Sequence, residues 1–263
     1  MLIATYNVNS INARLENLGA FLQKNGPDIM LLQEIKCTFE SFPFFELRSL
    51  GYDARILGQK SYNGVAVLSR TPIKVVCEGL PGFADDNARY LETEIKVEEE
   101  VYRVASLYLP NGNPPYNDPD DKTKFDYKLR WMEALYERAK ALLTLRQKVI
   151  LGGDFNVIMT PHDVYDPTLF LNNALYREEV KQRFKAIEYL GYYDAFRNLH
   201  PQENGYTFWD YAGSSLAADF GMRIDYLLLS PDAADRLESC MVDKEPRQGV
   251  KPSDHTVLKA VLR

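Results

Sequence analysis

The sequence predicts an α/β protein in which two mixed β-sheets pack face to face with helices outside. Short, nearly continuous apolar runs at residues 2–6 and 29–33 flank a segment with helical spacing at 14–25. This order is typical of buried strands that are joined by a helical crossover. Other strand-like segments follow one another without a helix between them, which excludes a purely parallel sheet. With 263 residues and no linker or repeat, the chain is expected to form one domain over residues 1–263.

The predicted elements of the first half follow from hydrophobic spacing and turn residues. The helix at residues 14–25 is ended by a Gly-Pro pair. Residues 65–69 and 73–77 are strand-like and flank a short turn that contains proline, so we expect them to form a hairpin. Residues 91–97 alternate apolar and charged side chains, the pattern of a half-exposed strand, and a turn leads into a further strand at 101–109.

The second half contains the longest predicted helix, at residues 125–143, which has one apolar stripe and many basic side chains on its other faces. A second amphipathic helix is expected at residues 178–190, again with one apolar stripe that faces the interior. The remaining strands are expected at 148–151, 207–211, 224–230, 237–242 and 257–262.

Composition and charge limit the classes of function. Three cysteines without Cys-x-x-Cys spacing argue against a disulfide framework and a structural zinc site, so a reducing, cytoplasmic location is expected. The sequence shows no membrane-spanning apolar run and no signal-peptide pattern, and no membrane partner is expected. The formal net charge is −6, but residues 122–148 hold eight bases against three acids. This local excess permits a nucleic-acid partner without establishing one.

Polar side chains recur where apolar runs end, and these positions are the candidate site: Asn7, Glu34, Asp154, Asn156, Asp225, Asp254 and His255. Any one of them alone is more often a hydrogen-bonded turn or core residue, but a whole set at strand ends favours a functional site. Oxygen ligands without cysteine favour Mg²⁺, with Mn²⁺ as an alternative, over zinc. Because no P-loop and no Gly-x-Ser-x-Gly motif is present, metal-assisted hydrolysis of a phosphate ester remains.

Eight short motifs, in order along almost the whole chain, resemble those of the exonuclease III family of DNA-repair nucleases. They are Ala-Thr-Tyr-Asn-Val-Asn-Ser (4–10), Leu-Gln-Glu-Ile-Lys (32–36), Tyr-Asn-Gly-Val-Ala (62–66), Leu-Tyr-Leu-Pro-Asn-Gly (107–112), Gly-Gly-Asp-Phe-Asn-Val (152–157), Tyr-Thr-Phe-Trp-Asp-Tyr (206–211), Arg-Ile-Asp-Tyr (223–226) and Ser-Asp-His (253–255). Each motif alone is weak, whereas eight in register are very specific. The resemblance implies the endonuclease/exonuclease/phosphatase fold, which is a four-layered α/β sandwich of two mixed sheets.

The resemblance also implies a metal site and a substrate. Glu34 is implied as the principal Mg²⁺ ligand, with Asn7 and Asp254 near the metal. The implied metal-binding set is completed by Asp154, Asn156 and His255. The implied substrate is double-stranded DNA with abasic sites or 3′ ends, and the protein is expected to act on it as a monomer.

The catalytic roles that the resemblance implies fit the chemistry of phosphodiester hydrolysis. Asp154 would orient or deprotonate the attacking water, and Asn156 would hold Asp154 and donate to a phosphoryl oxygen. Asp225 would accept a hydrogen bond from His255, which would keep the imidazolium charged for donation to the phosphate. Tyr108 would contact the scissile phosphate through its phenol. The metal, Asn156, the His255 cation and Tyr108 would all face the negative charge that develops during the reaction.

Further positions are implied as substrate contacts. Arg89 and Asn111 would bind the DNA backbone. The walls of a small apolar pocket, which would accept a flipped-out abasic sugar and exclude a full base, would be Phe208, Met222 and Ile224.

One segment departs from the family pattern. In abasic endonucleases of this family the loop that corresponds to residues 161–176 tends to be rich in Lys and Gly, whereas here it has no Lys, Arg or Gly and carries Tyr165 and Phe170. We hypothesise that this bulky loop obstructs the flipped sugar. Incision at internal abasic sites would then be weak relative to the trimming of 3′ ends.

Two other classes of function stay open. The same fold supports phosphomonoesterases and phospholipases, but those branches generally place a second catalytic histidine where this chain has Tyr108. A catalytically inactive binding protein would lack a metal ligand, and none of the implied ligands is missing.

Overall fold

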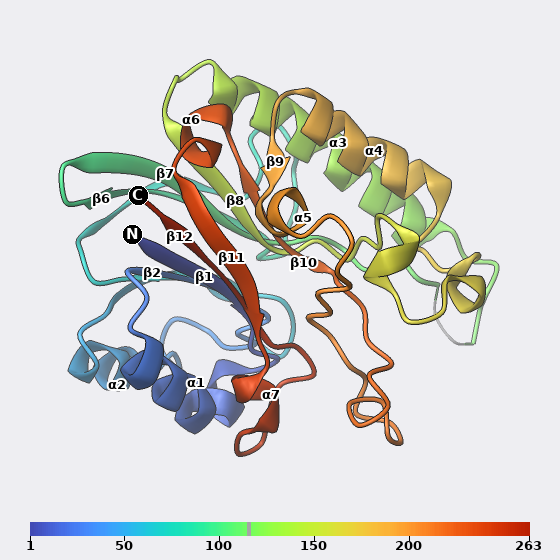
Figure 1. Ribbon diagram of the computed structural model, residues 1–263, viewed down its shortest axis with the longest axis horizontal. Helices are drawn as coiled ribbons and strands as arrows, with labels where there is room; N and C mark the ends of the chain where they lie inside the picture. Colours follow the sequence, from blue (N-terminus) through green and yellow to red (C-terminus); the bar gives the residue numbers. More distant parts are fainter. Residues whose placement is uncertain (115–116) are drawn as a thin grey trace.

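The computed structural model describes residues 1–114 and 117–263 and contains two six-stranded β-sheets (Figure 1). The strand order in the first sheet is β11 (Leu237–Asp243), β12 (Val257–Leu262), β1 (Leu2–Asn7), β2 (Ile29–Gln33), β4 (Val65–Ser69) and β3 (Asp53–Leu57). The order in the second sheet is β5 (Ile73–Glu78), β6 (Tyr90–Val97), β7 (Glu100–Tyr108), β8 (Lys148–Asp154), β10 (Asp225–Leu229) and β9 (Tyr193–Asp194).

Helices form the two outer layers (Figure 1). The first sheet is covered by α1 (Ile11–Asn25) and α2 (Phe44–Ser49), and the second by α3 (Thr123–Leu143) and α4 (Glu178–Tyr189). Shorter helices connect the strands: η1 (Pro161–Asp163), η2 (Pro167–Phe170), α5 (Ala195–Leu199), α6 (Pro231–Ala234) and α7 (Glu245–Gln248). The four layers confirm the predicted sandwich of two mixed sheets.

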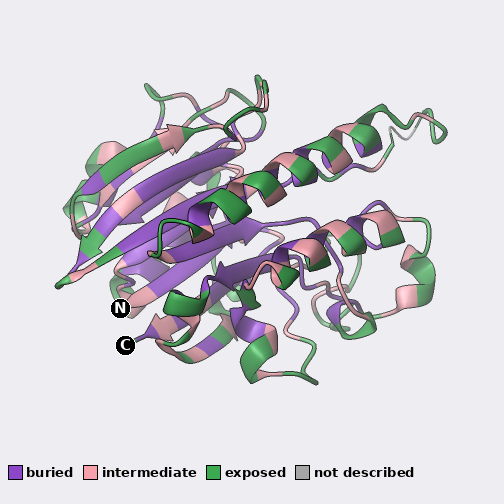
Figure 2. Cartoon of the chain, turned by 90° about the horizontal axis from the view of Figure 1, so that it is seen from above, coloured by how far each residue is buried: buried purple, intermediate pink, exposed green. Residues whose placement is uncertain are grey.

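Three clusters of buried apolar side chains hold the four layers together. Between the sheets, Leu31 of the first sheet belongs to the same cluster as Ile150 and Leu227 of the second. The other two clusters fill the space between each sheet and its helices, with Leu18 of α1 in one and Leu135 of α3 in the other. Figure 2 accordingly shows the central strands almost entirely buried and the outer helices with alternating buried and exposed stripes.

Strand direction brings several chain segments to one edge of the sandwich. β1 and β2 are parallel and joined by α1, and β7 and β8 are parallel and joined by α3. Parallel neighbours end at the same edge of a sheet. β10 runs antiparallel to β8, with Asp225 opposite Asp154, so its beginning lies at this edge as well.

Just before Asp154, Gly152 allows the two sheets to approach each other, and Gly153 allows β8 to lie close to its neighbour β7. A Cβ atom on Gly152 would lie 2.5 Å from Leu31 Cδ1 and 2.7 Å from Leu227 Cδ2. Gly153 has a φ of 152°, and a Cβ there would lie 1.9 Å from the carbonyl oxygen of Leu107. Only glycine fits these positions without displacing backbone or core, and Asp154 therefore emerges directly between the two sheets.

Two sequence-based predictions about strands are wrong. Residues 65–69 and 73–77 do not form a hairpin, because β4 pairs with β2 and β3 in the first sheet whereas β5 pairs with β6 in the second. Both edges of β4 are occupied, so the chain crosses to the other sheet. The expected strand at 207–211 is reduced to isolated bridges, in which Phe208 pairs with Met222 and with His255.

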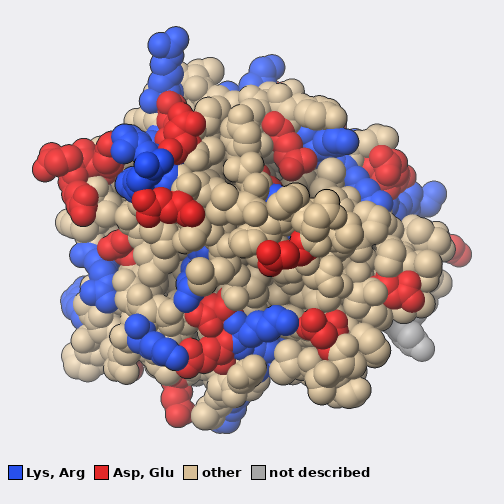
Figure 3. Space-filling model, in the orientation of Figure 1, with Lys and Arg blue, Asp and Glu red and all other residues tan. Residues whose placement is uncertain are grey.

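Charged side chains of both signs are intermixed on the face shown in Figure 3. Part of the basic excess of residues 122–148 is paired: Arg138 donates to the fully buried Glu92 at 2.7 and 2.9 Å, and Lys148 donates to Glu100 at 2.5 Å. The segment is therefore less basic than its sequence suggests. Among the described residues, every helix is too short or too polar to span a membrane.

Candidate active site

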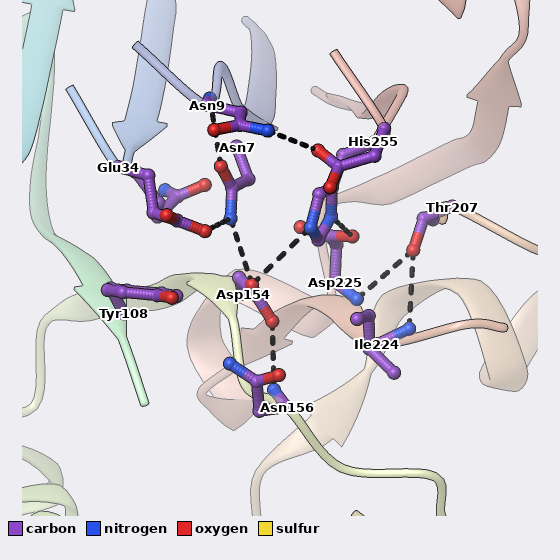
Figure 4. Close-up of polar contacts among 12 residues, drawn as sticks. Asn7, Asn9, Glu34, Tyr108, Asp154, Asn156, Thr207, Ile224, Asp225 and His255 are labelled. Carbon is purple, nitrogen blue, oxygen red and sulfur yellow. Dashed lines mark hydrogen bonds and ion pairs between the residues drawn. The ribbon is translucent and has the colours of Figure 1, made fainter. Parts of the chain in front are cut away.

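The ends of the strands at the shared edge carry the polar side chains that the sequence singles out (Figure 4). Asn7, Tyr108 and Asp154 are the last residues of β1, β7 and β8, and Asp225 is the first residue of β10. Glu34 directly follows β2. His255 lies in the segment before β12 and reaches the same point. Segments from the whole length of the chain thus converge on one cluster.

Asn7 connects the acids of the two sheets. Its Nδ2 atom donates to Glu34 Oε1 at 2.9 Å and to Asp154 Oδ2 at 3.0 Å, while its Oδ1 atom accepts from the amide of Asn9. Asn7 is fully buried, so its side chain is fixed by these partners. The two carboxylates are therefore held side by side by one shared donor.

Asp225 fixes the orientation of His255. The Nδ1 atom of His255 donates to Asp225 Oδ2 at 2.8 Å, and the opposite ring nitrogen, Nε2, lies 3.6 Å from Asp154 Oδ2. Burial alone would lower the pKa of His255, but the carboxylates of Asp225 and Asp154 outweigh it and raise the pKa. The imidazole is thus favoured as a cation whose Nε2–H points into the cluster (Figure 4).

Asp154 is the central acid of the cluster. It is almost fully buried, and its Oδ1 atom accepts from the backbone amide of Asn156 at 2.9 Å. Burial, together with the neighbouring charges of Asp225 and Glu34, raises the pKa of Asp154, although His255 opposes the shift. Both carboxylate oxygens have fixed partners, so the group cannot rotate freely.

A lysine and an asparagine border the cluster on the side of Glu34. Lys36 Nζ lies 2.9 Å from Glu34 Oε2 and donates to Asn9 Oδ1 at 2.5 Å, and Asn9 Nδ2 donates to Asp254 Oδ1 at 3.0 Å. Burial would raise the pKa of Glu34, but Lys36 and Asn7 outweigh it and hold the pKa below its usual value. The Glu34 carboxylate is therefore ionised at neutral pH, the form in which it can bind a cation.

The backbone is strained at several of these positions. Asn9, Glu34, Lys36 and Asn156 have φ values of 44°, 50°, 52° and 48°. Residues other than glycine seldom adopt positive φ, and such residues gather at sites where function requires an exact side-chain position. The strain coincides with the cluster, which supports a functional role for it.

The donor set fits a divalent cation. Glu34, Asp154 and His255 each bring one polar atom within 4.8 Å of the others. The two carboxylates are the ligands in this group, because both ring nitrogens of a protonated His255 are donors. Two carboxylates without cysteine suit a hard cation such as Mg²⁺ or Mn²⁺. Asp254 is connected to this group only through its hydrogen bond with Asn9. Asn156 is bonded to Oδ1 of Asp154, the oxygen that does not face Asn7 and His255. Asn7 turns its amide nitrogen toward the acids.

The residues with an implied DNA contact surround the cluster. The guanidinium of Arg89 lies 4.8 Å from the centre of the Tyr108 ring, and Arg89 donates to the Tyr108 carbonyl at 3.2 Å. Burial and the charges of Glu34 and Asp154 raise the pKa of the Tyr108 phenol well above its usual range. The exposed Asn111 donates to Asn156 Oδ1 at 3.3 Å.

The three predicted pocket walls lie together on the side of His255. The ring of Phe208 packs edge-on against His255 with centroids 5.0 Å apart, and Met222 pairs with Phe208 through the backbone. These walls form one apolar cluster with side chains of the 161–176 loop: Val164 is buried, and Phe170 packs against the same cluster as Met222 and Ile224.

Four residues of the site were not among the candidates from the sequence. Lys36 binds Glu34, and Asn9 binds Asp254. Ser253 donates to the carbonyl of Asn7, and Thr207 Oγ1 accepts from the amides of Ile224 and Asp225. All four stand inside or beside the motifs, which is the one signal that could have identified them. Their partners depend on how the strand ends meet.

Comparisons with known proteins agree with this geometry. The family model described as Endonuclease/Exonuclease/phosphatase family matches residues 4–255. Exodeoxyribonuclease III of Haemophilus influenzae is 28% identical over 100% of both chains. Two solved structures are each 35% identical to this chain with a TM-score of 0.92, and each match covers 100% of this chain and 99% of the other chain. They are an AP endonuclease from Archaeoglobus fulgidus and a 3′ phosphatase from Neisseria bound to a product DNA hairpin. The predicted resemblance to the exonuclease III family is confirmed, and the chain belongs to the endonuclease/exonuclease/phosphatase family.

Proposed function

We propose that the protein is a Mg²⁺-dependent DNA-repair phosphodiesterase that cuts DNA 5′ to abasic sites and removes blocking groups or nucleotides from 3′ ends. The position of the Asp154 carboxylate carries this proposal, because Asn7 and Glu34 lie on one side of it and the imidazole of His255 on the other. Hydrolysis of a phosphodiester needs a positioned water, a cation and a proton donor at one point. Relatives named exodeoxyribonuclease III and AP endonuclease support DNA as the substrate.

The side chains of the cluster have distinct tasks in this reaction. Asp154, held by Asn7 and by the amide of Asn156, accepts a hydrogen bond from the attacking water and directs it at the phosphorus atom. His255, oriented by Asp225, donates from Nε2 to a phosphoryl oxygen. A divalent cation bound at Glu34 would offset the charge that develops on the phosphate and the leaving oxygen.

Residues around the cluster bind the substrate in this proposal. The Tyr108 phenol donates to the scissile phosphate, and Arg89, which packs on the Tyr108 ring, contacts the DNA backbone together with Asn111. The Asn156 carboxamide has one N–H bonded to the Leu109 carbonyl, which leaves the second N–H for a phosphoryl oxygen.

We further propose that the protein removes 3′-terminal groups faster than it cuts at internal abasic sites. The support is the contact between the pocket walls and the 161–176 loop, where Phe170 packs against the cluster that contains Met222 and Ile224. Tyr165 packs edge-on against Phe170, with centroids 5.9 Å apart, and supports it from outside. A loop held in this way leaves little room for a flipped sugar.

A pair of alanine variants tests this substrate preference. Phe170→Ala should raise the rate at an internal abasic site relative to the release of a 3′-phosphate, because it removes bulk beside the pocket. Leu169→Ala is the matched control, since Leu169 is 64% exposed in the same loop. An internal cut that is much faster than 3′-phosphate release in the unmodified protein would refute the obstruction.

The proposed function itself is tested with labelled duplexes that carry an abasic site, a nick or a 3′-phosphate, with Mg²⁺ or with EDTA. We expect product only with Mg²⁺. Asp154→Asn should abolish turnover and leave DNA binding largely intact, whereas Asp86→Asn, which changes an exposed acid, should behave as the unmodified protein. Turnover by Asp154→Asn at the unmodified rate, or hydrolysis of small phosphate esters without hydrolysis of DNA, would overturn the proposal.

A further inference from the structure

Helix α3 carries a lysine that is buried beside the candidate site. Lys128 is 0% exposed, and its Nζ atom donates to the carbonyl oxygens of Asn156 at 2.6 Å and of Asn111 at 3.0 Å. Within the described residues, Lys128 forms no ion pair with a carboxylate. Burying an amine is unfavourable, and an apolar side chain of the same volume would serve the core at least as well. The stability of the core therefore does not explain the lysine.

The two carbonyl groups belong to the two segments that carry the carboxamides of the site. Asn111 follows β7, and Asn156 follows β8 with a φ of 48°. The side chains of these asparagines are bonded to each other, and the Asn156 amide is bonded to Asp154. A single side-chain nitrogen from a third element, α3, thus joins the backbones of both segments.

The aliphatic part of the lysine shapes the same loop. Gly112 has a φ of 85°, and a Cβ atom there would lie 2.6 Å from Lys128 Cδ and 3.2 Å from Lys128 Cβ. The backbone after Asn111 therefore lies directly on the lysine stem, where only glycine fits. Both the stem and the nitrogen of Lys128 determine where the Asn111 carboxamide stands.

We propose that Lys128 is a positioning residue for phosphate binding and hydrolysis, which acts by holding Asn111 and Asn156 in the positions that meet the scissile phosphate. This inference rests on the proposed function. It does not depend on the charge of Lys128, because the ammonium and the neutral amine both have enough N–H groups for two carbonyl acceptors. It does depend on the length of the Lys128 side chain and on the hydrogen bonds that its nitrogen donates. A substitution can change one of these two properties and keep the other.

Lys128→Met tests the proposal, because methionine has a similar length and no N–H donor. Displacing a phosphate-binding group by about 1 Å can cost on the order of 100-fold in rate, so we expect kcat/KM for 3′-phosphate release to fall by about 10- to 100-fold, mainly through kcat. Lys124→Met changes an exposed lysine of the same helix and should leave the rate unchanged within about twofold.

A double-mutant cycle with Asn111→Ala separates positioning from a general loss of structure. If Lys128 acts through Asn111, the two substitutions together should cost clearly less than the product of their separate effects. Strictly multiplicative effects, or a Lys128→Met protein with unchanged kcat, would overturn the proposal. Lys128→Gln keeps a donor and is the second variant if Lys128→Met does not fold. Failure of both to fold would show that the lysine serves the core, which also overturns the proposal.

A readout without activity keeps this inference distinguishable from the proposed function. In ¹⁵N-labelled protein, the side-chain amide signals of Asn111 and Asn156 should move or broaden in Lys128→Met and stay in place in Lys124→Met. If the unmodified protein hydrolysed no DNA, the proposed function would fail while these signals still tested the positioning. Unchanged signals in Lys128→Met would contradict the positioning even if DNA were hydrolysed.

Discussion

Replacing Asp225 with Asn probes the pair that orients the imidazole of His255, which acts as a donor to the phosphate in the proposed function. Asp225 is 0% exposed, and its Oδ2 atom accepts from His255 Nδ1 at 2.8 Å. Asparagine keeps the shape of the side chain but removes the charge. It can also turn its amide nitrogen toward Nδ1, which would move the ring proton to Nε2 and leave a neutral donor in place of a cation.

The size of the effect follows from the bond that is changed. A hydrogen bond to a charged partner contributes about 1.5–3 kcal/mol, and each 1.36 kcal/mol of lost transition-state stabilisation lowers the rate about tenfold. We therefore expect kcat for Asp225→Asn to be lower by about 10- to 150-fold. The dissociation constant for DNA should change little, because Asp225 is buried behind His255 and does not face the substrate.

Single-turnover release of phosphate from a 3′-phosphorylated duplex measures the chemical step, and fluorescence anisotropy of the same duplex measures binding. Asp232→Asn is the matched control, because Asp232 is exposed on the short helix that follows β10. A chemical rate for Asp225→Asn within twofold of the unmodified protein would refute the role of the pair. So would a loss of activity that comes entirely from weaker binding.

Two further predictions concern stability. Asp163 is 0% exposed, is bonded to Arg223 and Arg197 at 2.6 Å each, and holds the 161–176 loop. Asp163→Asn leaves these buried cations without their partner, so it should lower the free energy of unfolding in urea denaturation by about 3–5 kcal/mol. A loss below about 1 kcal/mol would contradict this. Burial, and secondarily the charge of Asp194, raises the pKa of Glu188 to about 7. The folded protein therefore favours the protonated carboxyl, and the stability that depends on this form is present at pH 4 and is lost as the pH rises through 7. Glu188→Gln should thus gain about 1–2 kcal/mol over the unmodified protein between pH 5 and 8, and an identical pH dependence of both would count against it.

The sequence was a good guide to the buried strands and a poor guide to which strands pair. The runs that become β1, β2 and β12 are apolar at nearly every position, so their burial is encoded locally. The expected hairpin between β4 and β5 fails because pairing depends on which edges are already occupied, and that is decided by distant parts of the chain. β3 and α2 were not predicted, because both are short and weakly patterned.

In the candidate site, too, the position of a residue along its strand can be predicted from the neighbouring sequence, whereas its contacts with distant segments cannot. The placement of Asp154 and Asp225 at strand ends is visible in the sequence, since each borders an apolar run. The contact of Lys36 with Glu34 is not, because it requires two residues with positive φ that turn the lysine back toward the acid. Lys128 lies on the buried stripe of α3, so the helical spacing is compatible with its burial. Its two carbonyl partners cannot be read from the sequence, because they belong to other segments of the chain.

The binding of a divalent cation at Glu34 is the central claim, and a Mg²⁺ titration of activity tests it most directly. The concentration of Mg²⁺ that gives half-maximal release of a 3′-phosphate should rise at least about tenfold in Glu34→Gln, because one of the two acids in the ligand group is removed. Glu40→Gln, which alters an exposed acid nearby, should titrate as the unmodified protein. Equal Mg²⁺ requirements in Glu34→Gln and the unmodified protein, or full activity in EDTA, would contradict the account.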